Sequence, residues 1–170
     1  TAGVPGRMER VSAGQPFTVI VDYAHTTDSL RKVLELLRPL TAGRLIVVLG
    51  SAGERDATKR APMGRAAAEL GDLVVVTDED PRLEDPRAIN EEIADGARAA
   101  GARDGETLWV IDDRREAIGH AIGLASDGDV VLLAGKGHEQ SMFHGTEARP
   151  WDDRTAAREA LSDVGWRSTE

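Results

Sequence analysis

Five short apolar runs, rich in β-branched residues, recur along the chain and predict buried strands. They span residues 17–21, 45–49, 73–76, 108–111 and 130–134. Between them, apolar residues recur at helical spacing, most clearly at Leu30, Val33, Leu34 and Leu37. Similar stripes are formed by Ile89, Ile93 and Ala97, and by Ile118, Ala121, Ile122 and Ala125. This alternation predicts an α/β fold: a doubly wound, mostly parallel sheet with helices on both faces.

Side-chain caps mark two of the predicted helix starts. Asp85 precedes Pro86, which is typical of a cap followed by a proline at the first helical position. Thr27, with Asp28, is expected to cap the helix that contains Leu30. Three further elements are expected: a short strand within 7–11, a hairpin within 140–149 around Gly145, and a last helix over 153–161. We find no repeat, low-complexity stretch or linker, so residues 1–170 are expected to form one domain.

Composition narrows the class of protein. The formal net charge is -9, with 30 acidic and 21 basic residues, which argues against nonspecific binding to nucleic acid or anionic membranes. The chain has no cysteine, which excludes disulfides and thiolate metal sites. Its longest apolar runs are far shorter than the roughly 20 residues that span a bilayer, and residues 1–10 contain no signal pattern. We therefore expect a soluble, cytoplasmic protein.

Polar residues gather directly after four of the apolar runs. In an open parallel sheet, ligands bind beyond the carboxyl ends of the strands, so these segments are the candidate site. They span residues 22–28, 50–56, 77–82 and 135–139. Neither glycine-bearing turn matches a phosphate fingerprint, because Gly50 is not followed by a glycine-lysine pair and Gln140 stands where a third glycine would follow Gly135 and Gly137. Each turn is therefore either a backbone site for an anion or a plain tight turn.

Charged side chains in these segments indicate a small zwitterionic ligand. The guanidinium groups of Arg55 and Arg82 suit bidentate binding of a carboxylate, although surface arginines are often only solvated charge. Glu79, Asp80 and Glu139 add the opposite sign nearby, as an ammonium group would require. The combination points toward an amino acid.

Metal binding and covalent catalysis are not predicted. His25 and His138 lack the further ligands that a zinc site needs. Ser51 lacks the strained turn of a nucleophile elbow. We therefore assign no metal ligand and no catalytic residue.

Three segments, in this order and spacing, resemble the C-terminal domain of Mur ligases, most closely the type that adds a diamino acid to UDP-MurNAc-L-Ala-D-Glu. They are Gly6-Arg7-Met8-Glu9, Asp22-Tyr23-Ala24-His25-Thr26 and Gly135-Lys136-Gly137-His138-Glu139. The resemblance covers nearly the whole chain. It implies a Rossmann-like, amino-acid-binding domain over 1–170, with an N-terminal UDP-binding domain and a central ATPase domain lying outside it.

The resemblance also implies a reaction. In this family, ATP phosphorylates the substrate carboxylate to an acyl phosphate, with Mg2+ held mainly by the central domain, and the amine of the incoming amino acid then displaces phosphate. This domain would deliver the amino acid, and it would lower the barrier of the reaction by positioning the amine. We expect a monomeric ligase of peptidoglycan synthesis, inactive as a fragment, with ATP and Mg2+ as cofactors and UDP-MurNAc-dipeptide bound by the other domains.

Residue roles follow by matching positions. The resemblance implies that the amino acid contacts Arg55, Glu79, Asp80, Arg82, Gly135 and Glu139. It implies that the adenine and ribose side of ATP contacts Arg7, Asp22, Tyr23 and His25. Lys136 and His138 belong to the same motif, with no role assigned.

The chain departs from the family at one position. Members that use meso-diaminopimelate usually carry Asp-Asn-Pro-Arg where this chain has Glu79-Asp80-Pro81-Arg82. The added negative charge should repel a second carboxylate and favour a terminal ammonium, although Arg82 acts in the opposite sense. We expect lysine or ornithine to be slightly favoured over meso-diaminopimelate.

Two other interpretations stay open. Cyanophycin synthetase and folylpolyglutamate synthetase carry related C-terminal domains, but the 135–139 loop and the Asp-Pro-Arg segment favour the Mur ligase type that adds a diamino acid. A stand-alone module that binds an amino acid or nucleotide is an alternative of a different class, because these residues contain no P-loop.

Overall fold

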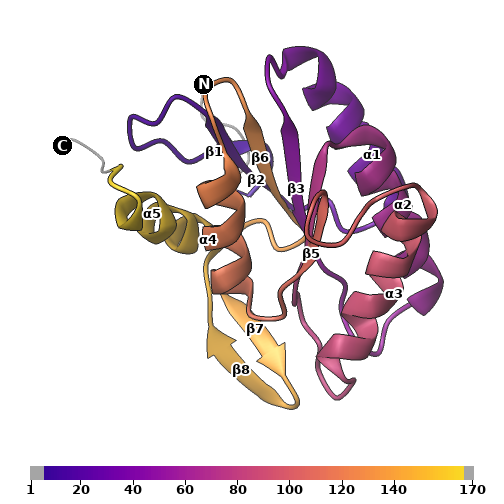
Figure 1. The fold of residues 1–170 in the computed structure, drawn as a ribbon. Coiled ribbons are helices and arrows are strands. Elements are labelled where there is room, and N and C mark those ends of the chain that lie inside the picture. Colours follow the sequence, from indigo (N-terminus) through magenta and orange to yellow (C-terminus); the bar gives the residue numbers. More distant parts are fainter. Residues whose placement is uncertain (1–5, 167–170) are drawn as a thin grey trace.

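A six-stranded sheet forms the centre of the computed structural model, which describes residues 6–166 (Figure 1). Its strands lie in the order β1-β2-β6-β3-β4-β5. β1 is antiparallel to β2, and all other neighbours are parallel. The strands are β1 (Glu9–Arg10), β2 (Thr18–Asp22), β3 (Leu45–Leu49), β4 (Leu73–Val76), β5 (Leu108–Val110) and β6 (Val130–Ala134). Parallel neighbours bring the carboxyl ends of β2, β6, β3 and β4 to one edge, where the polar segments follow.

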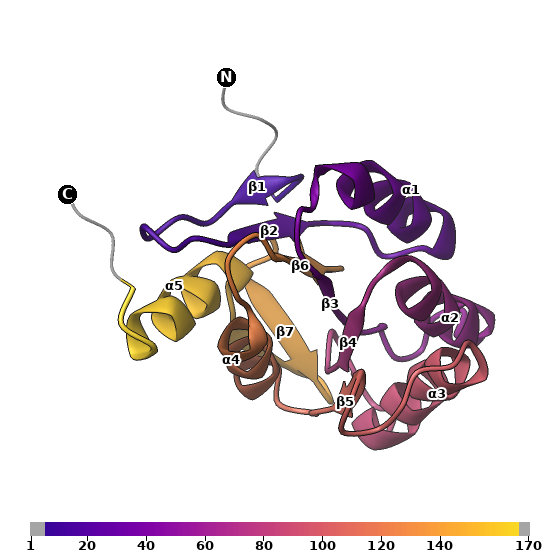
Figure 2. The ribbon, with the colours of Figure 1, turned by 45° about the horizontal axis from the view of Figure 1, so that its top comes forward.

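Helices cover both faces of this sheet (Figure 2). One face packs against α1 (Thr27–Leu37), α2 (Arg60–Leu70) and α3 (Pro86–Ala99), and the other against α4 (Arg114–Leu124) and α5 (Asp153–Asp163). Short 3-10 turns follow α1 (Arg38–Leu40) and precede α2 (Ala57–Lys59). Alternate residues of β3 serve the two cores, Val47 on the α1 side and Val48 on the α4 side. The predicted doubly wound α/β fold is confirmed.

The predicted elements mostly match the structure. The five predicted buried strands start and end within one residue of their predicted bounds, and β1 occupies two residues within 7–11. The hairpin forms as β7 (Ser141–His144) and β8 (Glu147–Pro150). Asp85 caps α3 as expected, since its side chain accepts from the Arg87 backbone N–H. The cap of α1 was predicted one residue too late. Thr26, and not Thr27, is the cap, because its hydroxyl and that of Ser29 satisfy each other's backbone N–H groups.

Helix α2 was not predicted, and small residues explain its packing. An added Cβ on Gly64 would collide with the Ile93 carbonyl of α3, and one on Gly96 would collide with the Ala61 carbonyl of α2. The two helices therefore approach backbone to backbone. The other buried residues of α2 are Arg60, Met63, Ala66 and Ala67, so α2 lacks the strong apolar stripe of α1.

A buried ion pair connects the second helical layer to the sheet. Arg114 donates to both carboxylate oxygens of Asp153 at 2.8 Å, and neither side chain is exposed. The guanidinium also donates to the carbonyls of Asp78 and Ala134, at the carboxyl ends of β4 and β6. The Trp151 indole completes the Asp153 carboxylate with a third hydrogen bond. One arginine thus holds α5 and two strand ends together.

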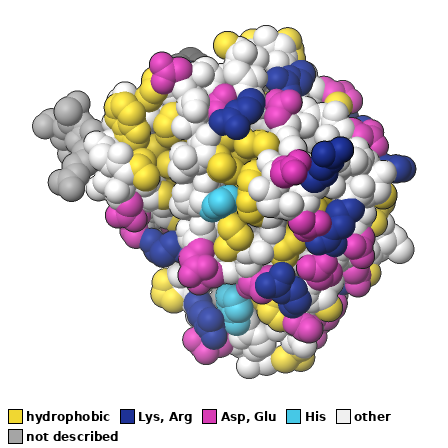
Figure 3. Space-filling view, viewed as in Figure 1, with side chains coloured by type: hydrophobic (Ala, Val, Ile, Leu, Met, Phe, Trp, Pro, Cys, Tyr) yellow, Lys and Arg dark blue, Asp and Glu magenta, His cyan; other side chains and the backbone are white. Residues whose placement is uncertain are grey.

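The surface carries both charge signs interspersed over the face seen in Figure 3. Several of these charges form exposed pairs, such as Lys32 with Asp28 one helical turn apart. Within residues 6–166, none of the helices is long and apolar enough to cross a bilayer.

Candidate functional site

A cavity of about 520 Å³ lies at the carboxyl edge of the sheet. Loops that follow β2, β3, β4 and β6 all contribute to its wall. It contains all six residues predicted to contact an amino acid, and also Tyr23 and His25. The lining residues are Tyr23, His25, Thr26, Ala52, Arg55, Asp56, Lys59, Glu79, Asp80, Arg82, Gly135 and Glu139.

Glu79 is the most buried acid of the cavity. It lies three residues after the end of β4, is 6% exposed, and its Oε1 atom has no hydrogen-bond partner among the described residues. Burial raises the pKa of Glu79 to about 7, against the opposing charges of Arg114, Lys136 and Lys59. Gly135 makes room for this carboxylate, because a Cβ there would collide with Glu79 Oε1. An unpartnered carboxylate that faces a cavity is suited to accept from an ammonium group.

Asp80 is internally paired. Its Oδ1 atom accepts from Lys136 Nζ at 3.1 Å and from the Phe143 backbone N–H at 2.9 Å. Lys136 is fully buried, so its charge compensates Asp80 at short range with little solvent screening. This pairing opposes the repulsion that the lysine or ornithine prediction attributed to Asp80.

Two arginines of the cavity have no carboxylate partner among the described residues. Arg55 is exposed and makes no salt bridge there. Arg82 makes none either, and its Nε atom is buried without a hydrogen-bond partner. The guanidinium of Arg82 lies 5.1 Å from the centre of the Phe143 ring. Both groups are therefore available to a bound carboxylate.

Of the predicted nucleotide-side residues, Tyr23 and His25 line this cavity, and Arg7 lies next to Tyr23. The Tyr23 and His25 rings are 4.5 Å apart at their centroids, and the Arg7 guanidinium lies 5.8 Å from the Tyr23 ring. Burial, and then the charges of Glu139 and Glu79, raise the pKa of Tyr23. These aromatic faces and the nearby cation have the chemistry that a purine nucleotide requires.

Asp22 has a different position from its predicted neighbours. It is buried, and its carboxylate accepts from the backbone N–H groups of Met8 and Ala24. Neither Asp22 nor Arg7 lines the cavity. Asp22 instead fixes the turn after β2 against the segment that carries Arg7, so its contact with a nucleotide stays a prediction.

Lys59 is a cavity residue that sequence reasoning missed. It ends the 3-10 turn before α2, and its Nζ donates to the His25 backbone carbonyl at 2.7 Å. The only signal in the sequence is its place four residues after Arg55, which is not distinctive without the fold. Lys59 connects the loop after β3 to the loop after β2.

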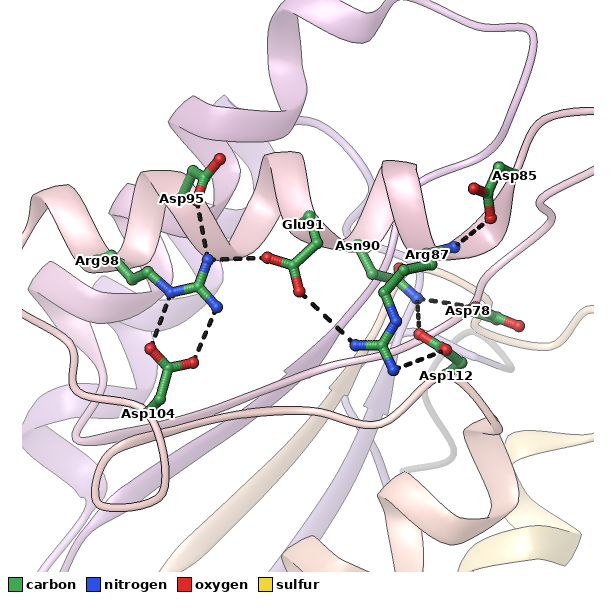
Figure 4. Close-up of polar contacts among 9 residues, drawn as sticks. All are labelled: Asp78, Asp85, Arg87, Asn90, Glu91, Asp95, Arg98, Asp104 and Asp112. Atoms are coloured by element: carbon green, nitrogen blue, oxygen red, sulfur yellow. Dashed lines mark hydrogen bonds and ion pairs between the residues drawn. The ribbon is translucent and has the colours of Figure 1, made fainter.

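A polar network connects α3 to the segment that follows β4, as Figure 4 shows. Asn90 of α3 is buried and donates from Nδ2 to Asp78 at 2.9 Å and to Asp112 at 3.0 Å. Burial, and then the nearby Asp112 charge, raise the pKa of Asp78. The network continues on the outer face of α3 through Arg87 and Glu91. Asp78 immediately precedes Glu79, so this network anchors the residue next to the cavity acid.

Metal ligation is not evident in this part of the molecule. Among residues 6–166 there is no group of three or more histidine, aspartate or glutamate side chains placed to hold a metal ion.

A family model decides what kind of domain this is. The model of the Mur ligase, glutamate ligase domain matches residues 6–137. The chain belongs to this Mur ligase family. The matched residues include the loops after β2, β3 and β4, and the start of the loop after β6.

Mur ligase relatives resemble the chain over nearly its whole length. A protein of Roseiflexus sp. strain RS-1 named UDP-N-acetylmuramyl-tripeptide synthetase is 57% identical over 96% of this chain and 32% of its own. A Streptomyces coelicolor protein named UDP-N-acetylmuramoyl-L-alanyl-D-glutamate--2,6-diaminopimelate ligase is 50% identical over 94% of this chain and 31% of its own. The chain thus spans about a third of these relatives. Neither name supports the lysine or ornithine preference.

Solved structures agree with this membership. A structure of a 2,6-diaminopimelate ligase of the same name as the Streptomyces protein superposes with a TM-score of 0.84 at 35% identity, over 96% of this chain and 33% of that one. A folylpolyglutamate synthase of Mycobacterium tuberculosis has a TM-score of 0.60 at 22% identity, over 98% of this chain and 34% of that one. The second likeness concerns the fold alone.

Proposed function

We propose that this chain is the amino-acid-binding domain of an ATP-dependent ligase that joins a diamino acid to UDP-MurNAc-L-Ala-D-Glu. One observation carries the proposal: a cavity at the strand ends holds two unpaired guanidinium groups and a buried, unpartnered carboxylate. The names of the Mur ligase relatives support the reaction class. The chain spans about a third of those relatives, so the UDP-binding and ATPase domains are proposed to lie outside residues 1–170.

We infer 2,6-diaminopimelate, and not lysine or ornithine, as the amino acid. It carries two carboxylates and two ammonium groups, whereas lysine and ornithine carry one carboxylate. Arg55 and Arg82 come from different loops and offer one site for each carboxylate. Glu79 and Glu139 offer acceptors for the ammonium groups. Since Lys136 compensates Asp80, a second carboxylate can approach Arg82 with little repulsion.

The nucleotide side is proposed to use Tyr23, His25 and Arg7, whose rings and charge fit an adenine base and its ribose. When bound, ATP supplies the phosphoryl group that activates the carboxylate of the acceptor. This chain contributes by orientation: arginines fix the carboxylates of the amino acid, and Glu79 fixes an ammonium group. Holding two reactants aligned can lower a barrier by roughly 7 to 11 kcal/mol.

The test is product formation by the full-length protein that contains this chain. UDP-MurNAc-L-Ala-D-Glu, ATP and Mg2+ are supplied with 2,6-diaminopimelate, lysine or ornithine in turn, and products are identified by mass. We expect a tripeptide product with 2,6-diaminopimelate at a kcat/KM well above the other two. Preference for lysine or ornithine contradicts the assigned amino acid, and no tripeptide with any of the three contradicts the reaction.

The reading frame of the gene distinguishes a ligase from the remaining alternative, a stand-alone binding module. A ligase requires an upstream region that encodes a phosphate loop ending in Gly-Lys-Thr or Gly-Lys-Ser. A frame without such a loop would favour a stand-alone binding module.

A further inference from the structure

The β7–β8 hairpin contacts the candidate site through its free edge. In this hairpin, Phe143 pairs with Ala148 of β8 on one side. On the other side its backbone N–H donates to Asp80 at 2.9 Å, and its carbonyl accepts from the Arg82 backbone N–H at 3.1 Å. Residues 80–82 therefore cover the open edge of β7, which would otherwise leave its backbone groups unpaired.

The contact continues one residue further along β7. His144 forms a parallel bridge with Arg82, and the Gly145 N–H donates to the Arg82 carbonyl at 2.7 Å. Arg82 has a φ of 56°, a left-handed conformation that side chains rarely adopt. The hydrogen bonds made by its backbone N–H and by its carbonyl hold Arg82 in that conformation, and hence determine the direction of its side chain.

The side chain of Phe143 adds a second constraint. The centre of its ring lies 5.1 Å from the Arg82 guanidinium carbon, within the range of a cation–π contact. Phe143 is half-buried, so the ring is a wall for the guanidinium and does not enclose it. It is not among the residues that line the cavity.

We propose that Phe143 is a positioning residue that determines specificity by orienting Arg82 toward the second carboxylate of the diamino acid. This inference rests on the proposed function, since it concerns the same cavity. Phe143 acts only on the contact between the Arg82 guanidinium and this second carboxylate. Its loss therefore weakens binding of a substrate with a second carboxylate and leaves binding of lysine, which lacks that carboxylate, unchanged.

The test uses three variants of the full-length protein. Phe143→Leu keeps an apolar side chain of similar size and removes the aromatic face, whereas Phe143→Tyr keeps the face. Thr146→Ala, in the exposed turn of the same hairpin, is the matched control. KM and kcat are measured for 2,6-diaminopimelate, lysine and ATP.

For Phe143→Leu we expect KM for 2,6-diaminopimelate to rise about two- to fivefold, the range of a partly exposed cation–π contact. Values of kcat, and of KM for lysine and ATP, should stay unchanged. Phe143→Tyr should retain the wild-type KM, and Thr146→Ala should match the wild type throughout.

Two results would overturn the inference. One is an unchanged KM for 2,6-diaminopimelate in Phe143→Leu, and the other is an equal rise for lysine, which indicates general damage to the hairpin. A wild-type protein that forms no product with any diamino acid would refute the proposed function instead. The two failures are therefore distinguishable.

Discussion

Glu79 is buried, its Oε1 atom has no hydrogen-bond partner within residues 6–166, and burial disfavours the charged form of its carboxylate. A carboxylate that is 6% exposed loses most of its hydration, which is why its pKa rises to about 7. Three cations, Arg114, Lys136 and Lys59, oppose that rise but do not cancel it. Near neutral pH, Glu79 is therefore protonated to a greater extent than an exposed glutamate.

This protonation predicts a pH dependence of substrate binding. Because the pKa of Glu79 is raised to about 7, the side chain becomes increasingly neutral as pH falls through this value, and its neutral form accepts poorly from an ammonium group. The apparent affinity of the full-length protein for its diamino acid should fall as pH decreases from 8 to 6, by up to about tenfold per unit below the pKa. Glu79→Gln should bind weakly at every pH and lose this profile. An identical profile in wild type and Glu79→Gln, measured as KM against pH, would assign the titration to another group.

At the scale of elements, much of the fold follows from pattern. The buried strands are recognisable because every residue of β3 and β6 is apolar, as expected of a parallel strand covered on both faces. The hairpin was predicted from Gly145, which has a φ of 62° in the structure. Helix α2 was missed because Met63 is the one large apolar residue of its buried face, and the arginine, glycine and alanines beside it give little periodic contrast.

Site residues were predictable to the extent that they lie in a loop that follows a strand. Glu79 and Gly135 follow β4 and β6 closely, and the rule for parallel sheets locates them. Lys59 was missed because it enters the cavity from a 3-10 turn. The pairing of Asp80 with Lys136 was missed because the two residues lie in different loops, 56 residues apart in sequence.

The close packing of α2 on α3 predicts that position 64 requires glycine. Gly64→Ala places a methyl group against the Ile93 carbonyl and should lower the free energy of unfolding by about 1 to 3 kcal/mol, the cost of overpacking. Gly119→Ala in α4 is the matched control, since no atom lies within 4 Å of its added Cβ. It should raise stability by about 0.5 to 1 kcal/mol. Urea unfolding of both variants checks this, and a stable Gly64→Ala would mean that the helices can separate at little cost.

For the whole molecule, the Arg114–Asp153 pair predicts how α5 is attached. Arg114→Leu leaves Asp153 buried without its cation, which should cost about 3 to 5 kcal/mol and expose the amides of α5 to hydrogen exchange before those of α3. Arg115→Leu is the control, because Arg115 pairs with Glu159 between the same helices but on the exposed surface. It should change stability by less than about 1 kcal/mol. Equal effects of the two variants would contradict a special role for the buried pair.

The most direct test of the account is a crystal structure of the full-length protein with 2,6-diaminopimelate bound. We predict the ligand in the cavity at the carboxyl ends of β2, β3, β4 and β6, with one carboxylate on Arg55, the other on Arg82, and an ammonium group on Glu79. A ligand that lies outside this cavity, or that leaves both arginines in solvent, would contradict the account.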